Sequence, residues 1–253
     1  MASFEIRNLS KSYDGKLVLN NLNFKINDGE LLSILGKSGC GKTTLLKILI
    51  GIEKPSSGTI LKNKRNITNL AISKRDMGIV FQNYALFPNM TVLENVSYAL
   101  KNKLKDKNKA TKEAKKIINM VNLDEHINKY PSELSGGQMQ RVAIARTLAL
   151  KPDVILFDEA LSALDADNKL MLRKEIKKLQ KEFKITMVFI THDQEEAFSI
   201  SDRVMVMNDG CIEQLDTPNK IFNYPSSKFV EEFVVKHLKE KVSSIEKCIR
   251  VDL

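Results

Sequence analysis

One stretch of sequence decides the fold: Leu31-Leu32-Ser33-Ile34-Leu35, followed directly by Gly36-Lys37-Ser38-Gly39-Cys40-Gly41-Lys42-Thr43. The short apolar run predicts a buried parallel strand, and residues 44–50 predict a helix. The segment between them fits G-x-x-x-x-G-K-[ST], in which glycines let backbone N–H groups approach phosphates closely and permit positive φ. A loop of this kind at a strand-to-helix turn indicates an α/β fold with a phosphate-binding site.

Two side chains of this loop have specific expected contacts. Lys42 is placed to reach the β- and γ-phosphates of a nucleotide, and Thr43 can offer its hydroxyl to Mg²⁺. The bare pattern also occurs as a glycine-rich turn with an incidental lysine, but the flanking strand and helix disfavour that interpretation. The full phosphate-binding set predicted here is Gly36, Lys37, Ser38, Gly39, Cys40, Gly41, Lys42, Thr43 and Thr44.

Cys40 is one of three widely spaced cysteines, which support neither a disulfide framework nor a zinc site. It lies inside the loop, near Lys42 and the start of a helix. We therefore expect the pKa of its thiol to be lowered, so that an alkylating reagent there blocks nucleotide binding.

A second apolar run, Val154-Ile155-Leu156-Phe157, ends in two carboxylates, Asp158 and Glu159. A buried strand would place both acids at its carboxyl end, where open α/β sheets bind ligands. Asp158 is predicted to hold Mg²⁺, directly or through water, and Glu159 to accept a proton from the attacking water. A solvated strand end is the alternative, but so buried a strand is an unfavourable place for idle charge.

A third segment, Leu134-Ser135-Gly136-Gly137-Gln138, precedes apolar residues at helical spacing between Met139 and Leu150. It predicts a second helix N-terminus with exposed backbone N–H groups, ready for an anion. Taken alone, it could be a serine N-cap followed by flexible glycines. One chain therefore carries two candidate half-sites for phosphate.

In this order the three motifs resemble those of the nucleotide-binding subunit of an ABC transporter, and the resemblance extends over residues 4–235. It implies ATP and Mg²⁺ as cofactors and ATP hydrolysis as the activity. Gln82 matches a glutamine whose amide oxygen reaches Mg²⁺ and the water, His192 matches a histidine that contacts the γ-phosphate, and Tyr13 resembles an aromatic residue that stacks on adenine. Without the resemblance, each would be an ordinary loop residue.

The resemblance also implies that two chains share each ATP. Ser135 and Gly137 would bind the γ-phosphate held by the other subunit, with Gly136 and Gln138 beside them, and Ala163-Leu164-Asp165 would carry Asp165 across the seam. The expected assembly is a homodimer, or a heterodimer with a related ATPase subunit.

The organisation along the chain predicts one P-loop NTPase core with two additions. Alternation at period two in residues 4–7 and 22–26 predicts an antiparallel β-subdomain, and helical spacing predicts an inserted α-helical subdomain at about 91–150. The ATPase domain is predicted to span 1–235, with a short C-terminal tail over 236–253.

Composition excludes several classes of protein. The 253 residues are 43% hydrophobic and 28% charged, contain no uninterrupted apolar stretch of bilayer length, and show no export signal. We therefore expect a chain that is soluble when isolated and stays in the cytosol. The resemblance implies a peripheral position at the cytoplasmic face of the membrane. The net charge of +9 is spread over amphipathic segments, which favours solvated helix faces over nucleic-acid binding.

Residues 82–92 are further similar to ATPases of bacterial importers for oligosaccharides, polyamines, ferric iron, sulfate or phosphonates. In that group the residues Tyr84, Leu86 and Phe87 are exposed, so that they would line a groove for a helix of an integral-membrane permease. A separate extracytoplasmic binding protein would deliver the solute. The three side chains could instead belong to the core of the helical subdomain. One departure is Ala160, where the family usually has proline; we expect it to alter the hydrolysis rate only.

The sequence thus predicts an ATP-hydrolysing subunit of a bacterial importer. The alternative is a soluble ABC ATPase that acts on ribosomes or DNA, a class that usually joins two cassettes or inserts a long coiled coil. A P-loop kinase would leave residues 134–138 unexplained. The sequence does not identify the transported solute.

Overall fold

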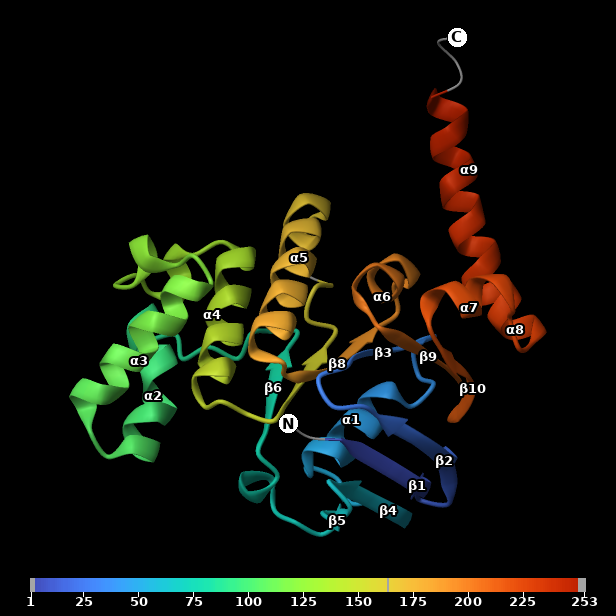
Figure 1. Cartoon of the computed structure of the whole chain (residues 1–253), viewed down its shortest axis with the longest axis horizontal. Helices are drawn as coiled ribbons and strands as arrows, with labels where there is room; N and C mark the ends of the chain where they lie inside the picture. Colours follow the sequence, from blue (N-terminus) through green and yellow to red (C-terminus); the bar gives the residue numbers. More distant parts are fainter. Residues whose placement is uncertain (1–2, 163, 250–253) are drawn as a thin grey trace.

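The structure is a computed structural model that describes residues 3–162 and 164–249. Ala163 of the predicted seam loop and residues 250–253 of the predicted tail lie outside this part. Within it, a central sheet has the order β10-β9-β3-β8-β7-β6 (Figure 1), in which β10 pairs antiparallel to β9 and the other neighbours are parallel. The strands are β3 Leu31–Gly36, β6 Met77–Phe81, β7 Val154–Asp158, β8 Thr186–Thr191, β9 Arg203–Asn208 and β10 Cys211–Asp216.

The middle strands of this sheet are apolar without alternation because both faces are covered. In β7, Ile155 and Phe157 pack on the side of the larger helices, while Val154 and Leu156 pack toward the other sheet. All four are fully buried. Continuous apolar runs in the sequence therefore correctly predicted parallel strands buried between two layers.

A second, antiparallel sheet lies beside the first, with the order β2-β1-β4-β5 in the described chain (Figure 1). Its strands are β1 Phe4–Tyr13, β2 Lys16–Ile26, β4 Ser57–Lys62 and β5 Arg65–Asn66, and helix α1 Lys42–Ile50 packs between the two sheets. Helix α1 is apolar on most of its surface because it has a sheet on each side.

The helices on the other face form the largest core cluster. They are α2 Val92–Leu104, α3 Lys107–Met120, α4 Gly136–Ala149 and α5 Ala166–Phe183. Short 3₁₀ turns in the described residues are Ile72–Lys74, between β5 and β6, and Asp124–His126 and Pro131–Glu133, between α3 and α4. Helix α2 begins with a complete capping box between Thr91 and Glu94, which explains its sharp start.

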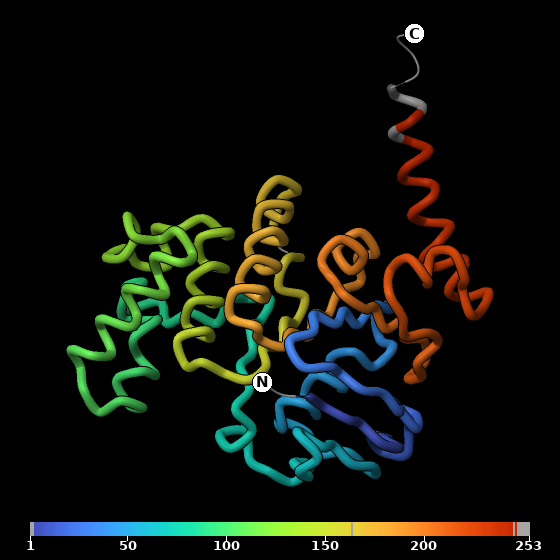
Figure 2. Tube along the Cα trace, in the orientation of Figure 1, coloured from blue at the N-terminus to red at the C-terminus, as the bar shows by residue number. Residues whose placement is uncertain are grey.

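The C-terminal helices form a third cluster with β3 and β9. They comprise α6 Gln194–Ile200, α7 Pro218–Asn223, α8 Lys228–Val230, a π-helical stretch Glu231–Lys236 and α9 His237–Ile249. The trace in Figure 2 shows α9 projecting away from the body of the molecule. No helix in residues 3–162 and 164–249 combines the length and apolarity needed to cross a bilayer.

Candidate nucleotide site

The phosphate-binding loop connects β3 to α1 as predicted, and Lys42 lies inside it. The Lys42 ammonium donates to the carbonyl oxygens of Gly36 at 2.8 Å and Lys37 at 2.9 Å, and the residue is 5% exposed. No carboxylate pairs with it among the described residues. A buried cation beside a helix N-terminus, without an anionic partner from the chain, suits a phosphate group.

Two glycines in this loop adopt backbone conformations that other residues rarely take. Gly39 has φ 82° and Gly41 has φ 101°. Gly36, which we expected to behave alike, does not have a positive φ; it is needed for space, because a Cβ there would lie 2.5 Å from the Met207 carbonyl oxygen and 2.6 Å from Cys40 Sγ. The loop is thus held closely against β9.

The β9–β10 hairpin supports the loop, a role that sequence reasoning missed. The turn residues Asp209 and Gly210 both have positive φ, as expected for a two-residue hairpin. The Gly210 N–H donates to the Cys40 carbonyl at 3.2 Å, and its own carbonyl accepts from Asn20 N–H at 2.9 Å. A segment 170 residues away therefore anchors the loop to β2, and no local pattern in the sequence indicates this.

The two carboxylates follow β7 at the same edge of the sheet. Burial and the neighbouring Glu159 carboxylate raise the pKa of Asp158, while the Lys47 and Lys42 ammonium groups oppose the rise. Glu159 has φ 47°, and its N–H donates to the Ile190 carbonyl of β8 at 3.1 Å. The turn directs the two acids differently, which fits distinct roles.

His192 and Gln82 reach this edge from the neighbouring strands. His192 follows β8, and its Nδ1 lies 3.5 Å from Glu159 Oε2. Gln82 follows β6, whose last residue Phe81 pairs with Asp158, and its side chain is exposed. Because the carboxyl ends of parallel strands meet at one edge, the structure places Gln82, Asp158, Glu159 and His192 at the edge where β3 leads into the loop that carries Lys42 and Thr43. These four residues and Thr43 make up the predicted catalytic and metal sets.

The segment Ser135–Gln138 begins helix α4, three residues earlier than the predicted helix over 139–150. Ser135 is the exposed N-cap, its hydroxyl accepting from Gln138 N–H at 3.3 Å and its N–H donating to Gln138 Oε1 at 2.9 Å. Gly137 lies against Asn168 of α5, since a Cβ on Gly137 would lie 3.2 Å from Asn168 Oδ1. Because the first N–H groups of a helix have no partner within the helix, this helix start can offer backbone donors to an anion.

Asp165 caps α5 close to that segment. Its carboxylate accepts from Asn168 N–H at 2.9 Å and from Asn168 Nδ2 at 2.7 Å, and these hydrogen bonds lower the pKa of Asp165. Asn168 therefore contacts both Asp165 and the surroundings of Gly137. No pattern in the sequence indicates a role for Asn168, since an asparagine in a helix is not distinctive.

The expectation of a lowered pKa for the Cys40 thiol is wrong. Its thiol is buried, and burial raises its pKa more than the nearby Lys42 ammonium lowers it. Proximity in sequence to a lysine and a helix start suggested an activated thiolate, but desolvation by the packed loop outweighs both.

Tyr13, the predicted adenine contact, ends β1 and is 38% exposed, with the Lys11 ammonium 4.6 Å from the centre of its ring.

Of the three residues predicted to line a permease groove, only Phe87 is exposed. Tyr84 and Leu86 are partly buried against the helical core rather than exposed, whereas Phe87 is exposed. A hollow of about 310 Å³ opens beside Phe87, whose ring lies 5.0 Å from that of Tyr98. Its lining comprises Met77, Gly78, Ile79, Phe87, Tyr98, Ala99, Arg146, Thr147, Leu150 and Pro152.

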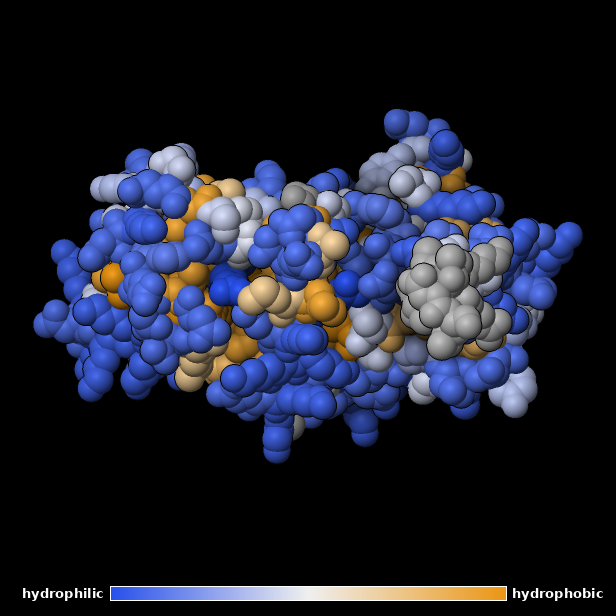
Figure 3. Space-filling model, turned by 90° about the horizontal axis from the view of Figure 1, so that it is seen from above, coloured by the Kyte–Doolittle hydropathy of each residue, from blue (hydrophilic) through white to orange (hydrophobic). Residues whose placement is uncertain are grey.

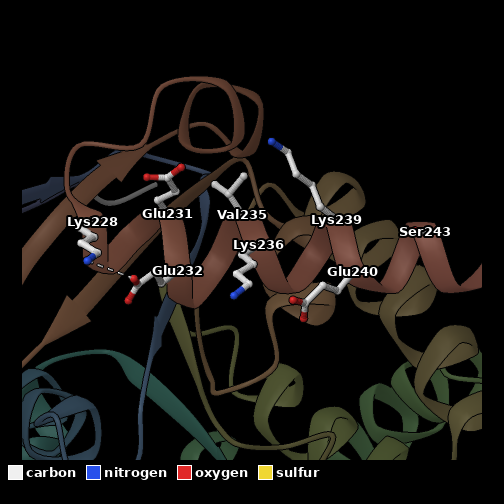
Figure 4. A pocket seen from close by; sticks show the side chains of 8 residues that line it. All are labelled: Lys228, Glu231, Glu232, Val235, Lys236, Lys239, Glu240 and Ser243. Atoms are coloured by element: carbon white, nitrogen blue, oxygen red, sulfur yellow. Dashed lines mark ion pairs between the residues drawn. The ribbon is translucent and has the colours of Figure 1, made fainter.

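A hollow of about 510 Å³ runs along the C-terminal helices (Figure 4). Its charged lining is balanced: Lys228, Lys236 and Lys239 face Glu231, Glu232 and Glu240, and Lys228 pairs with Glu232 at 3.7 Å. None of the phosphate-loop residues lines it. This hollow is therefore separate from the candidate nucleotide site at the strand edge.

A family profile described as "ABC transporter" matches residues 19–162. The spermidine/putrescine import ATP-binding protein PotA of Mycoplasma capricolum is 46% identical over 230 residues, which cover 91% of this chain and 66% of PotA. The sulfate/thiosulfate import ATP-binding protein CysA of Pectobacterium atrosepticum is 43% identical over 98% of this chain and 76% of CysA. The chain thus spans slightly less than two thirds of the length of PotA.

Among solved structures, the dimeric structure of MJ0796, a bacterial ABC transporter cassette, superposes with a TM-score of 0.75. It is 35% identical, and the match covers 85% of this chain and 98% of the cassette. This agreement confirms the predicted fold class, an α/β P-loop core with its two additions.

Proposed function

This chain belongs to the ABC transporter family, and we propose that it binds and hydrolyses ATP to power solute import through a membrane permease. One observation carries the proposal: Glu159 and His192 are 3.5 Å apart at the sheet edge that also holds the buried Lys42. A base, a polar partner for it and a phosphate-binding cation at one edge are the elements that phosphoryl transfer to water requires.

Each residue has a defined part in the proposed reaction. Lys42 exchanges its two backbone carbonyl contacts for the β- and γ-phosphate oxygens. Glu159 takes the proton of the attacking water, and His192 orients Glu159 and contacts the γ-phosphate. Thr43, Gln82 and Asp158 would hold Mg²⁺, which supplies positive charge to the phosphates. Tyr13 offers its exposed ring to the adenine base.

The second half of the site would come from another subunit. The start of α4 has an exposed Ser135 followed by the partly exposed Gly136, Gly137 and Gln138. Asp165 lies close by, so a second chain facing this one could complete each phosphate cradle. Figure 3 looks onto the side toward which β6 runs in Figure 1, and apolar side chains gather over its middle among hydrophilic ones. Such a mixed face suits an interface that opens and closes.

The hollow beside Phe87 is the proposed contact for the permease. It combines two tilted aromatic rings with an apolar floor, the surface that an apolar helix would fill. Docking there would place the chain at the cytoplasmic face of the membrane. The named solutes of the relatives include polyamine cations and the sulfate anion, so one cassette type serves opposite charges, and we assign no solute.

The test uses the Glu159→Gln variant, which keeps the size of the side chain but removes the base. We expect hydrolysis to fall by about 10²–10⁴-fold while ATP still binds, so that a closed dimer accumulates in saturating ATP. Steady-state hydrolysis and light scattering measure both effects. A variant that remains monomeric in saturating ATP would contradict the shared site.

The transport role is tested separately by purifying this variant from its native cells with ATP in mild detergent and identifying what accompanies it. A multi-spanning permease is the expected companion. Ribosomal proteins or DNA-repair factors without any membrane protein would favour the soluble alternative, for which the comparisons give no support.

A further inference from the structure

Arg146 connects two parts of the molecule that have separate proposed roles. It lies on α4, and its guanidinium donates to the carbonyl oxygens of Ala85 at 2.6 Å and Tyr84 at 3.1 Å. These residues follow Gln82 by two and three positions. The same guanidinium lies 5.7 Å from the centre of the Phe87 ring and lines the hollow beside it.

The segment that Arg146 holds is a tight turn in an unusual conformation. Tyr84 and Ala85 have φ values of 60° and 48°, in the left-handed region that residues with a Cβ adopt infrequently. The Tyr84 N–H donates to the Phe81 carbonyl at 3.0 Å, so the turn starts directly at the end of β6. Such a conformation persists only where the surroundings hold it, and the two guanidinium bonds do so here.

The charge of Arg146 is not matched by a carboxylate. No ion pair joins it to an acid within the described part of the chain, and burial lowers its pKa without removing its charge. Both of its strong contacts are therefore to the turn, and the side chain is held between the turn and the Phe87 ring.

We infer that Arg146 is a positioning residue that fixes Gln82 through the Tyr84 and Ala85 carbonyls and links Gln82 to whatever fills the hollow beside Phe87. The inference rests on the proposed function. The occupant would be a permease helix, and its arrival against Phe87 would shift the guanidinium and, with it, the turn. Gln82 would then move relative to Asp158, with which the last residue of β6 pairs.

Arg146→Met tests the positioning role because it keeps the apolar stem and removes both bonds. We expect kcat for ATP hydrolysis by the purified chain to fall about 10- to 100-fold, since small misplacements in a site have effects of that size. The Kd for ATP should change less than about twofold, because the phosphate loop is untouched. A merely structural role would instead weaken binding and hydrolysis together and lower the melting temperature.

Lys103→Met is the matched control. Lys103 also donates from a helix of the same layer to a backbone carbonyl, that of Leu150 at 2.8 Å, but it does not touch the turn after β6. Its kcat should equal that of the unaltered chain. If Arg146→Met hydrolyses ATP at the rate of this control, the inference is overturned.

Two further measurements keep the test decisive. If Arg146→Met does not fold, the Arg146→Lys variant is measured in its place. Lysine keeps the positive charge but lacks the forked guanidinium that bonds two carbonyls at once. A lower kcat with an unchanged Kd for ATP supports the inference, and an unchanged kcat refutes it. In the reconstituted permease complex, Arg146→Met should lose the change in kcat that the permease produces in the unaltered chain; retention of that change would refute the link. Absence of hydrolysis by the unaltered chain would instead count against the proposed function.

Discussion

The two helix starts that are proposed to bind phosphate differ in how much of their geometry the chain itself supplies. At the phosphate loop, Lys42 is buried, the loop is bonded to the β9–β10 turn, and Glu159 and His192 lie at the same edge. At the start of α4, Ser135 is exposed and forms a capping box with Gln138, whose side-chain amide also contacts the His126 ring. The phosphate loop is therefore organised within a single chain, whereas the start of α4 would need a phosphate held by another chain.

This difference explains why the chain would bind nucleotide alone yet hydrolyse it only as a pair. A preorganised cradle does not need a partner to hold phosphate. The start of α4 offers a phosphate only a few backbone N–H groups. These groups would contribute once the γ-phosphate of an ATP bound to the other subunit's phosphate loop is brought against them. The comparison therefore predicts that damage to the first half-site affects binding, and that damage to the second affects catalysis.

Removing Lys42 should have the largest effect. Lys42→Ala deletes a charged donor, and hydrogen bonds to charged groups contribute about 1.5–3 kcal/mol each, so we expect ATP affinity to fall by about 10²-fold. Isothermal titration with the purified chain measures this. Lys54→Ala, an exposed lysine just beyond α1, is the control and should bind normally. Undiminished binding by Lys42→Ala would remove the phosphate loop from the proposed site.

Ser135→Ala should affect catalysis and stability moderately. Loss of the N-cap lowers the free energy of unfolding by about 0.5–2 kcal/mol, while ATP binding by the single chain stays normal because Ser135 is not part of its own phosphate loop. Denaturant unfolding, titration and steady-state hydrolysis give the three quantities.

Thr91→Ala is the control that separates the capping role of Ser135 from its proposed role in binding phosphate. Thr91 and Glu94 form the same kind of capping box at α2, and neither residue belongs to the predicted phosphate-binding sets. Its loss should destabilise the chain similarly without lowering hydrolysis beyond that effect. If Ser135→Ala and Thr91→Ala reduce hydrolysis equally, Ser135 acts only as a cap and the second half-site loses its support.

The smallest effect concerns pH. The pKa of Asp158 is raised by burial and by Glu159, so this carboxyl gains its proton at a higher pH than an ordinary aspartate as the pH falls. Because Mg²⁺ requires the ionised form, Mg²⁺-dependent ATP binding should weaken on acidification from above the usual aspartate range. Asp158→Asn should bind Mg·ATP weakly at every pH. An acid limb that persists unchanged in this variant would assign it to another group.

Sequence reasoning succeeded where a motif and its flanking pattern are local. The loop between Leu31 and Ile50, the acids after Phe157 and the histidine after β8 all follow apolar runs, and parallel strands necessarily bring such ends to one edge. It failed where a residue's surroundings come from distant segments. Tyr84 and Leu86 were expected to be exposed, but the packing of α4 against the chain after β6 partly buries them.

The amino-acid sequence by itself determined the strand-to-helix turns, the order of the half-sites and the family, because glycine spacing, apolar runs and carboxylates at strand ends are properties of short segments. The tertiary structure decided which distant residues contact those segments and in which direction the pKa values of their side chains shift. It buries Cys40 and so raises the pKa of its thiol, anchors the loop through Gly210, and brings Arg146 to the turn after Gln82. Desolvation and hydrogen bonding depend on neighbours far away in the chain, and only folding brings those neighbours into contact.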